Sequence, residues 1–187
     1  MSTPEINRIE KVSNLLVTCH SILSSRYLRR AFLLNLISTL FSAVLAILIF
    51  APQELLSKIN PTGFDNTMFM GCLAAVLFLL SLVEMKVAWK EKGSFHKDAA
   101  NAYSRVKLEI RASYRDGKID DAKMQDISTK YSLIGEMHPP VPDDQFVKLK
   151  KKHKLKIEVS KYLDKNPAAN IFLVHIKLWI RDNCKWL

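Results

Sequence analysis

The chain has 187 residues, of which 49% are hydrophobic and 25% charged, and its formal net charge is +10. Charged residues are absent from positions 31–53 and 66–83, whereas 22 of the 28 Lys and Arg follow residue 83. The rest of the chain is too short for a large catalytic domain, and five Gly leave little material for a phosphate-binding loop.

Residues 1–30 are predicted to form an N-terminal amphipathic helix on the cytoplasmic side. Apolar side chains recur there at intervals of three and four, the spacing of one helix face. This face is expected to contact either a partner helix or the membrane surface. Its members are Ile6, Ile9, Val12, Leu16, Cys19, Leu23 and Tyr27.

Residues 31–83 are predicted to form a transmembrane helical hairpin, with spans at about 31–52 and 66–84. The first uncharged run of 23 residues would be roughly 35 Å long as a helix, enough to cross a hydrocarbon core of about 30 Å. The second run has 18 residues. The alternatives are a buried core hairpin of a soluble domain and an apolar hairpin covered by other subunits of a complex.

Positive charge on the flanks of these runs predicts the orientation. The connector between the runs carries only Lys58, and the outer flanks carry eight Lys and Arg: Lys11, Arg26, Arg29, Arg30, Lys86, Lys90, Lys92 and Lys97. Because cytoplasmic loops are enriched in these residues, both termini are expected in the cytoplasm, with the connector as an external turn.

Residues 84–187 are predicted to form a basic, cytoplasmic, all-helical domain. A long helix leaves the second span and continues to about residue 110, weakened at Gly93 by about 1 kcal/mol relative to Ala. A turn at Asp116-Gly117 then leads to a returning helix, which is capped by Asp120 or Asp121 and forms an antiparallel pair with the first.

Three prolines, Pro139, Pro140 and Pro142, separate this pair from the C-terminal part of the chain. Asp143 is expected to cap a helix over 145–163, which Asn166-Pro167 ends. The segment 168–187 is too short and too polar to span a membrane. It is expected either to pack in the cytoplasmic domain or to lie at the membrane interface, anchored by Trp179 and Trp186.

Polar and small residues in the two spans are the candidate sites within the membrane. Asn35, Ser38, Thr39 and Ser42 share one helix face, which either lines a hydrated pore in an oligomer or serves helix packing. Of these, Asn35 is the strongest pore candidate, because its amide cannot easily be satisfied within its own helix. Gly71 and Ala75 form a small pair that allows close helix approach.

Charged residues at the inner membrane boundary are a second candidate group: Arg29, Arg30, Glu84 and Lys86. Either Glu84 pairs with one of the arginines across the hairpin, or it is a solvated charge at headgroup level.

A lysine run follows the proline segment and consists of Lys148, Lys150, Lys151, Lys152, Lys154 and Lys156. These residues bind anionic lipid, bind nucleic acid, or form a solvated face. The five histidines lack metal-ligand spacing, the three cysteines are odd in number and far apart, and the sequence contains neither a nucleophile elbow nor a Walker motif. We therefore expect no enzyme activity, cofactor or metal.

The chain resembles the SLATT family of bacterial conflict-system membrane effectors over nearly its whole length. The resemblance is carried by two spans, a basic helical tail, and Trp89, Tyr103, Leu108-Glu109, Tyr131, Pro139, Pro140, Pro142, Phe146 and Ser160-Lys161-x-Leu163-Asp164. It implies a multi-pass inner-membrane protein that self-assembles and opens a pore or disrupts the membrane during phage infection. The implied trigger is a partner in trans: a nucleotide second-messenger synthase, a SLOG protein or a defence reverse transcriptase.

Two functions follow as hypotheses from the spans, the tail and this resemblance. One is a conducting homo-oligomeric effector gated by its cytoplasmic helices. The alternative is a membrane-anchored, non-conducting scaffold that recruits a defence enzyme or nucleic acid through the basic tail.

Overall fold

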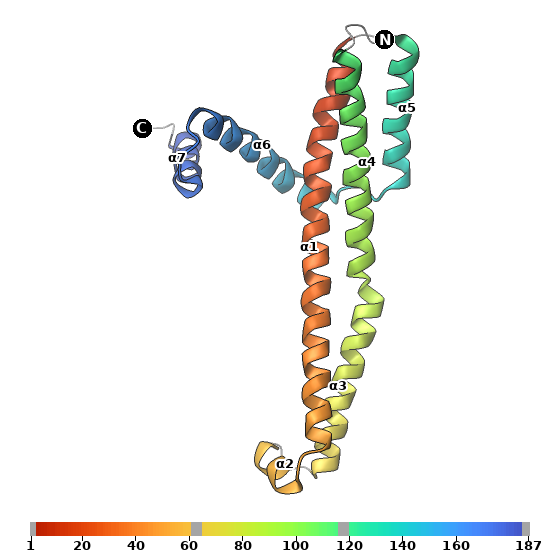
Figure 1. Ribbon diagram of the computed structural model, residues 1–187, viewed down its shortest axis with the longest axis vertical. Coiled ribbons are helices and arrows are strands. Elements are labelled where there is room, and N and C mark those ends of the chain that lie inside the picture. Colours follow the sequence, from red (N-terminus) through yellow and green to blue (C-terminus); the bar gives the residue numbers. More distant parts are fainter. Residues whose placement is uncertain (1–2, 61–64, 116–119, 185–187) are drawn as a thin grey trace. The chain divides into compact units, whose positions relative to one another are not determined.

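The computed structural model of the chain describes residues 3–60, 65–115 and 120–184 (Figure 1). Every regular element in these ranges is an α-helix, which confirms the all-helical fold class. The Asp116-Gly117 turn and Trp186 lie outside the described residues. The helices are α1 (Thr3–Ile49), α2 (Gln53–Ile59), α3 (Asn66–Val87), α4 (Trp89–Arg115), α5 (Asp121–Met137), α6 (Asp143–Lys165) and α7 (Ile171–Asn183).

The chain divides into two compact units. The first unit combines the residues up to Ile22 with those from Asp98 onward, and the second comprises Leu23–Lys97. Helices α1 and α4 each contribute to both units. Helix α1 continues without interruption through residue 30, where the sequence predicted the boundary of a separate N-terminal helix.

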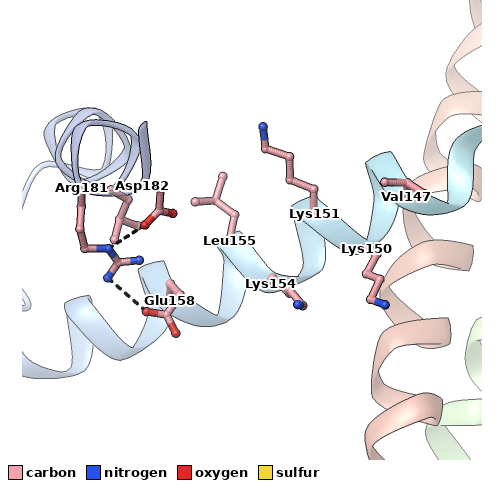
Figure 2. A pocket seen from close by; sticks show the side chains of 9 residues that line it. Val147, Lys150, Lys151, Lys154, Leu155, Glu158, Arg181 and Asp182 are labelled. Carbon is pink, nitrogen blue, oxygen red and sulfur yellow. Dashed lines mark hydrogen bonds and ion pairs between the residues drawn. The ribbon is translucent and has the colours of Figure 1, made fainter. Parts of the chain in front are cut away.

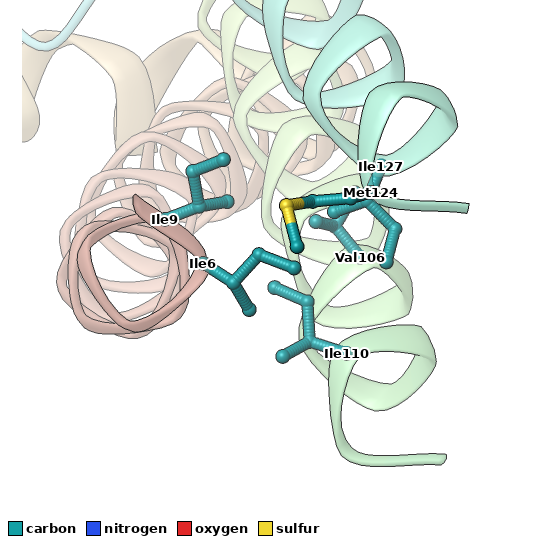
Figure 3. Close-up of a cluster of buried hydrophobic side chains, with 6 residues drawn as sticks. All are labelled: Ile6, Ile9, Val106, Ile110, Met124 and Ile127. Carbon is teal, nitrogen blue, oxygen red and sulfur yellow. The ribbon is translucent and has the colours of Figure 1, made fainter. Parts of the chain in front are cut away.

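The main core of the first unit lies where α1, α4 and α5 meet (Figure 3). It is formed by Ile6, Ile9, Val106, Ile110, Met124 and Ile127, with Tyr131 and Ile134 packed against it. The N-terminal apolar face therefore contacts partner helices and not the membrane surface. The contacts between α4 and α5 confirm that these helices pack as a pair, and each fully buried Ile side chain contributes roughly 1.5–3 kcal/mol.

Polar contacts lie at the edges of this core, both between its helices and within α5. Arg111 on α4 contacts Glu10 on α1 at 3.1 Å. On α5, the Lys130 ammonium lies 2.7 Å from both Glu109 and Asp126, and hydrogen bonds to these two carboxylates raise the pKa of Lys130. These pairs are largely exposed, so they contribute less to stability than the apolar core does.

Helix α6 joins the first unit through two buried residues, Leu149 and His153, and α7 packs along α6. Val174 and Leu178 of α7 form a small core with Val159 of α6. Pro142 occupies the N-cap position that the sequence predicts for Asp143, because the proline ring fixes φ, here at −57°, in the range that precedes a helix. Asp143 is instead the first helical residue, where its carboxylate interacts favourably with the positive end of the helix dipole.

The second unit contains a close approach between α1 and α4 at Gly93. A Cβ at this position would lie 2.8 Å from Leu28 Cγ and 3.2 Å from the Leu28 backbone nitrogen. The Ser24 hydroxyl donates a hydrogen bond to the Gly93 carbonyl at 2.8 Å, and the Tyr27 ring stacks on His96. Gly93 is therefore a packing position.

The prediction of one long helix leaving the second span was wrong at a single residue. Helix α4 passes through Gly93 without a break, and the interruption lies at Ala88 between α3 and α4. Ala88 has φ 50° and ψ 42°, the left-handed region that L-residues other than Gly rarely adopt. The position lies five residues after the end of the second apolar run.

The connector between the apolar runs contains a short helix, α2, where the sequence predicted a turn. The Asn66 side chain at the start of α3 donates to Gln53 at 2.9 Å and accepts from Asn60 at 3.2 Å. Leu56 is buried. These contacts attach α2 to α3.

Half-buried residues recur every three or four positions along the apolar parts of α1 and α3, as in helices that pack side by side. On α1 they are Ala31, Leu34, Ser38, Phe41, Leu45 and Leu48; on α3 they include Phe69, Leu73, Leu77, Leu80, Glu84 and Val87. The two helices run beside each other in Figure 1 and jointly line one pocket.

Candidate functional site

The apolar parts of α1 and α3 are long and apolar enough to cross a membrane. Their most apolar 18-residue windows have mean hydropathies of 2.4 and 2.2, and no residue of either window is buried. The exposed side chains include Phe32, Leu40 and Ile47 on α1 and Phe78 on α3. A core helix of a soluble domain would have most of this window buried, and so large an exposed apolar surface is unfavourable in water.

The structure divides the polar face of the first span. The Ser38 Oγ atom lies on the half-buried side of α1 and has no hydrogen-bond partner within the described chain. Asn35, Thr39 and Ser42 are exposed. The Thr39 hydroxyl donates to the Asn35 carbonyl and the Ser42 hydroxyl to the Ser38 carbonyl, both at 2.8 Å, so these two side chains are satisfied by their own helix.

Asn35 differs from Thr39 and Ser42 because its side-chain amide forms no hydrogen bond within the described part of the chain, and it differs from Ser38 because it is exposed. An amide carries two donors and one acceptor, and leaving them unpaired in hydrocarbon is unfavourable.

Gly71 and Ala75 lie on the exposed side of α3, which does not face α1. No atom of the described chain lies within 4 Å of the position that a Gly71 Cβ would occupy. The surface is therefore open to another helix, and the small residues would allow its backbone to approach closely.

The structure bears on the two alternatives for Glu84, an ion pair across the hairpin or a solvated charge. Among the described residues, no ion pair joins Glu84 to Arg29 or Arg30, and both arginines are exposed, as is Lys86. Glu84 is half-buried and lines a pocket of about 230 Å³ between the first turns of the α1 span and the α3–α4 junction, together with Ala31, Leu34 and Trp89. The pocket thus includes the residues around the Ala88 break.

The six lysines of the run in the first part of α6, from Lys148 to Lys156, are exposed, and none of the six forms an ion pair or hydrogen bond with another described residue. They lie on two sides of the helix. Lys150, Lys151 and Lys154 line a groove of about 440 Å³ between α6 and α7 (Figure 2). The other three, Lys148, Lys152 and Lys156, do not line it.

The floor of this groove is apolar, formed mainly by Leu155 of α6 and Leu178 of α7. At its far end Arg181 lies between Asp182, at 2.9 Å, and Glu158, at 3.6 Å. The hydrogen bond to Asp182 is the main cause of the raised pKa of Arg181. Arg181 is thus already paired, whereas the three lysines are free to bind an anion.

Helix α7 has a second apolar face that the sequence analysis did not recognise. Val174 and Leu178 are buried against α6, and the opposite side of the helix is exposed. The exposed residues are Phe172, Leu173, Ile176, Trp179 and Ile180. In a helical projection of 171–180 the apolar residues fall on two separate arcs, so the sequence itself indicates the second face.

Three histidines are buried: His20, His96 and His153. His20 stacks on Tyr103 in the first unit, and burial lowers the pKa of His96 in the second. Among the described residues no group of three His, Cys, Asp or Glu could hold a metal ion. Cys19 is buried, which raises its thiol pKa, while Cys72 and Cys184 are exposed.

No protein family, curated protein or solved structure matches this chain. The resemblance to the SLATT family therefore stays a prediction from the residues that carry it, and the functional argument depends on the geometry of the chain itself.

Proposed function

We propose that the chain is a membrane effector that oligomerises and opens a conducting path across the bilayer. In this proposal α1 and α3 form a two-span hairpin, both termini are cytoplasmic, and the remaining helices receive the activating signal. The proposal is supported by α1, which runs as one uninterrupted helix from the core of the first unit into the first apolar span.

The observation that carries the proposal is the side-chain amide of Asn35, which is exposed and has no partner among the described residues, whereas the exposed hydroxyls of Thr39 and Ser42 are bonded within their own helix. Polar side chains at membrane depth face other helices or water-filled cavities far more often than lipid. Copies of the chain arranged around Asn35 would satisfy the amide through inter-helix hydrogen bonds or pore water. The open side of α3 at Gly71 and Ala75 supplies a second contact for the same assembly.

The test is a liposome flux assay with purified full-length chain, comparing Asn35→Leu with the native sequence. Each lost inter-helix contact is worth about 1–2 kcal/mol, which lowers the association constant about tenfold, so flux should fall by at least this factor. Thr39→Val is the matched control, because the Thr39 hydroxyl is already bonded within its own helix. It should leave flux nearly unchanged.

Both variants must insert to the same extent, as measured by resistance to alkaline extraction. Undiminished flux in Asn35→Leu would contradict pore lining by this face. Loss of flux in both variants would show that the whole surface serves packing alone.

The SLATT resemblance extends the proposal to inner-membrane localisation and antiphage defence. It also proposes an activating sensor or enzyme in trans: a nucleotide second-messenger synthase, a SLOG protein or a defence reverse transcriptase. Co-expression of the chain with an activated partner should depolarise cells, and co-expression with an inactive variant of that partner should not.

The non-conducting scaffold is the second candidate, favoured by the free lysines on α6. It predicts capture of an enzyme or a nucleic acid without any change in membrane permeability. Affinity purification combined with a membrane-potential dye distinguishes the two functions in one culture.

A further inference from the structure

We infer that α6 and α7 form a lipid-docking element that binds the headgroups of anionic phospholipids in the α6–α7 groove and inserts the outer face of α7 into the bilayer surface. The two elements of this site are adjacent. Leu155, Leu178 and Lys151 line the basic groove and also a second pocket, of about 470 Å³, that includes Ile176 and Trp179.

The shape of α7 is that of an interfacial helix. It has 13 residues, too few to span a bilayer, and it is apolar on two opposite sides. One side is occupied by α6, and the other exposes Trp179 at 61% and Phe172 at 70%. Aromatic residues favour the boundary between acyl chains and headgroups, and helices of this kind lie in the plane of that boundary.

Charge identifies the occupant as anionic lipid. From Asp143 to the end of the sequence there are eleven Lys and Arg against five Asp and Glu. Lys150, Lys151 and Lys154 border the apolar surface and have no carboxylate partner in the described parts of the chain. They can therefore bind a phosphate, while the floor of the groove accepts the glycerol and first methylenes. A neutral protein surface would match the apolar face and leave these three charges unpaired.

The covalent connection to the spans makes such docking efficient. A weakly binding element held close to a bilayer by its own chain meets the surface at high effective concentration, so moderate affinity suffices. The inference uses the proposed membrane insertion but not conductance. A chain that conducts nothing could still dock.

The test reads the fluorescence of Trp179 in the full-length chain reconstituted in nanodiscs. Trp89→Phe and Trp186→Phe leave Trp179 as the only tryptophan. With bromine on the acyl chains, discs that contain phosphatidylglycerol should quench Trp179 and shift its emission to the blue, and purely zwitterionic brominated discs should do so much less. Co-elution of the chain with the discs, checked first, reports insertion separately from docking.

Two triple variants that remove the same number of charges distinguish headgroup binding in the groove from non-specific electrostatic attraction to the anionic surface. Lys150→Gln, Lys151→Gln and Lys154→Gln together should lower the ratio of docked to free element by about fivefold per lysine. The control, Lys148→Gln, Lys152→Gln and Lys156→Gln, alters lysines that lie outside the groove and should retain most of the quenching.

Equal loss in the two triple variants would overturn the groove as the headgroup site. Absence of quenching in anionic discs, with crosslinking of α7 to a protein or to nucleic acid instead, would overturn lipid as the occupant. Should the single-tryptophan chain misfold, an environment-sensitive dye on Ile176→Cys, in a chain with its three native cysteines changed to Ser, gives the same measurement.

Discussion

The two halves of helix α1 invert the ordinary relation between hydropathy and burial. In the first half, polar side chains such as Ser13, His20 and Ser24 are buried, as are the apolar side chains of Ile6 and Leu23. In the second half, from residue 31 to 49, nearly every residue is apolar and none is buried. A single helix thus has a packed, partly polar half and an apolar half with a largely open surface.

This difference fits the proposed membrane insertion, in which water surrounds one half of the helix and lipid the other. In water, apolar residues are buried because their hydration is unfavourable, and the first half of α1 follows that rule through its contacts with α4 and α5. In lipid no such force drives apolar residues inward, and helix contacts depend on packing and on polar groups. The exposed apolar surface of the second half of α1 is what that second rule allows for a proposed membrane span.

The largest expected difference in stability is between two isoleucine truncations, one in the buried core and one on the exposed apolar half of α1. Ile110 is fully buried in the core, so Ile110→Ala should lower the free energy of unfolding by about 2–5 kcal/mol. Ile47 is 70% exposed, and Ile47→Ala should change it by no more than about 0.5 kcal/mol. Denaturant titration of both variants in mild detergent measures the two values. A large loss in Ile47→Ala would mean that another protein surface covers the apolar half.

A smaller loss is expected from Gly93→Ala in the second unit. Helix propensity alone would favour the alanine by about 1 kcal/mol, but the new Cβ would lie 2.8 Å from Leu28 Cγ, and overpacking of this kind costs about 1–3 kcal/mol. The net effect on thermal stability should be destabilising. Leu28→Ala should restore part of the loss in the double variant, while the backbone nitrogen at 3.2 Å prevents full recovery. Stabilisation by Gly93→Ala would contradict the close approach.

A gain of about 1 kcal/mol is expected from Ala88→Gly. Glycine adopts the left-handed conformation without the steric cost that an alanine Cβ incurs at φ 50°. The same substitution at Ala99, a buried position inside α4, is the control and should destabilise the chain. Thermal unfolding of both variants provides the comparison, and a loss at position 88 equal to that at 99 would show that α3 and α4 form one continuous helix.

The contrast between Ala88 and Gly93 also shows which features could be predicted from the sequence. Periodicity identified the buried face from Ile6 to Leu23, and proline positions identified the separation of α5 from α6, because both depend on local geometry. The break at Ala88 was missed because alanine is the best helix former, so only packing can place it in the left-handed region.

The candidate sites follow the same division between local and tertiary information. Helical spacing placed Asn35 and Ser38 on one stripe, but which part of that stripe is buried depends on the position of the neighbouring helix. The lysine run was evident in the sequence. Its division into groove and outer lysines required the position of α7, which no local pattern specifies.

The smallest effect, and the most specific to the packed region, is the pH dependence of His153. The Thr18 hydroxyl donates to the Asn14 carbonyl, so it accepts from His153 Nδ1 at 2.9 Å. Burial, and then the charges of Lys156 and Lys107, lower the pKa of His153. The folded state therefore binds a proton less readily than the unfolded state. Its stability should be highest above about pH 6.5, the ordinary histidine pKa, and should decrease as the pH falls through the folded pKa.

The variant His153→Gln should reduce the difference in melting temperature between pH 8 and pH 5, measured by circular dichroism. The control His175→Gln, on the exposed side of α7, should leave this difference unchanged. An undiminished pH dependence in His153→Gln would assign the acid sensitivity to another group, such as His96, whose pKa burial also lowers.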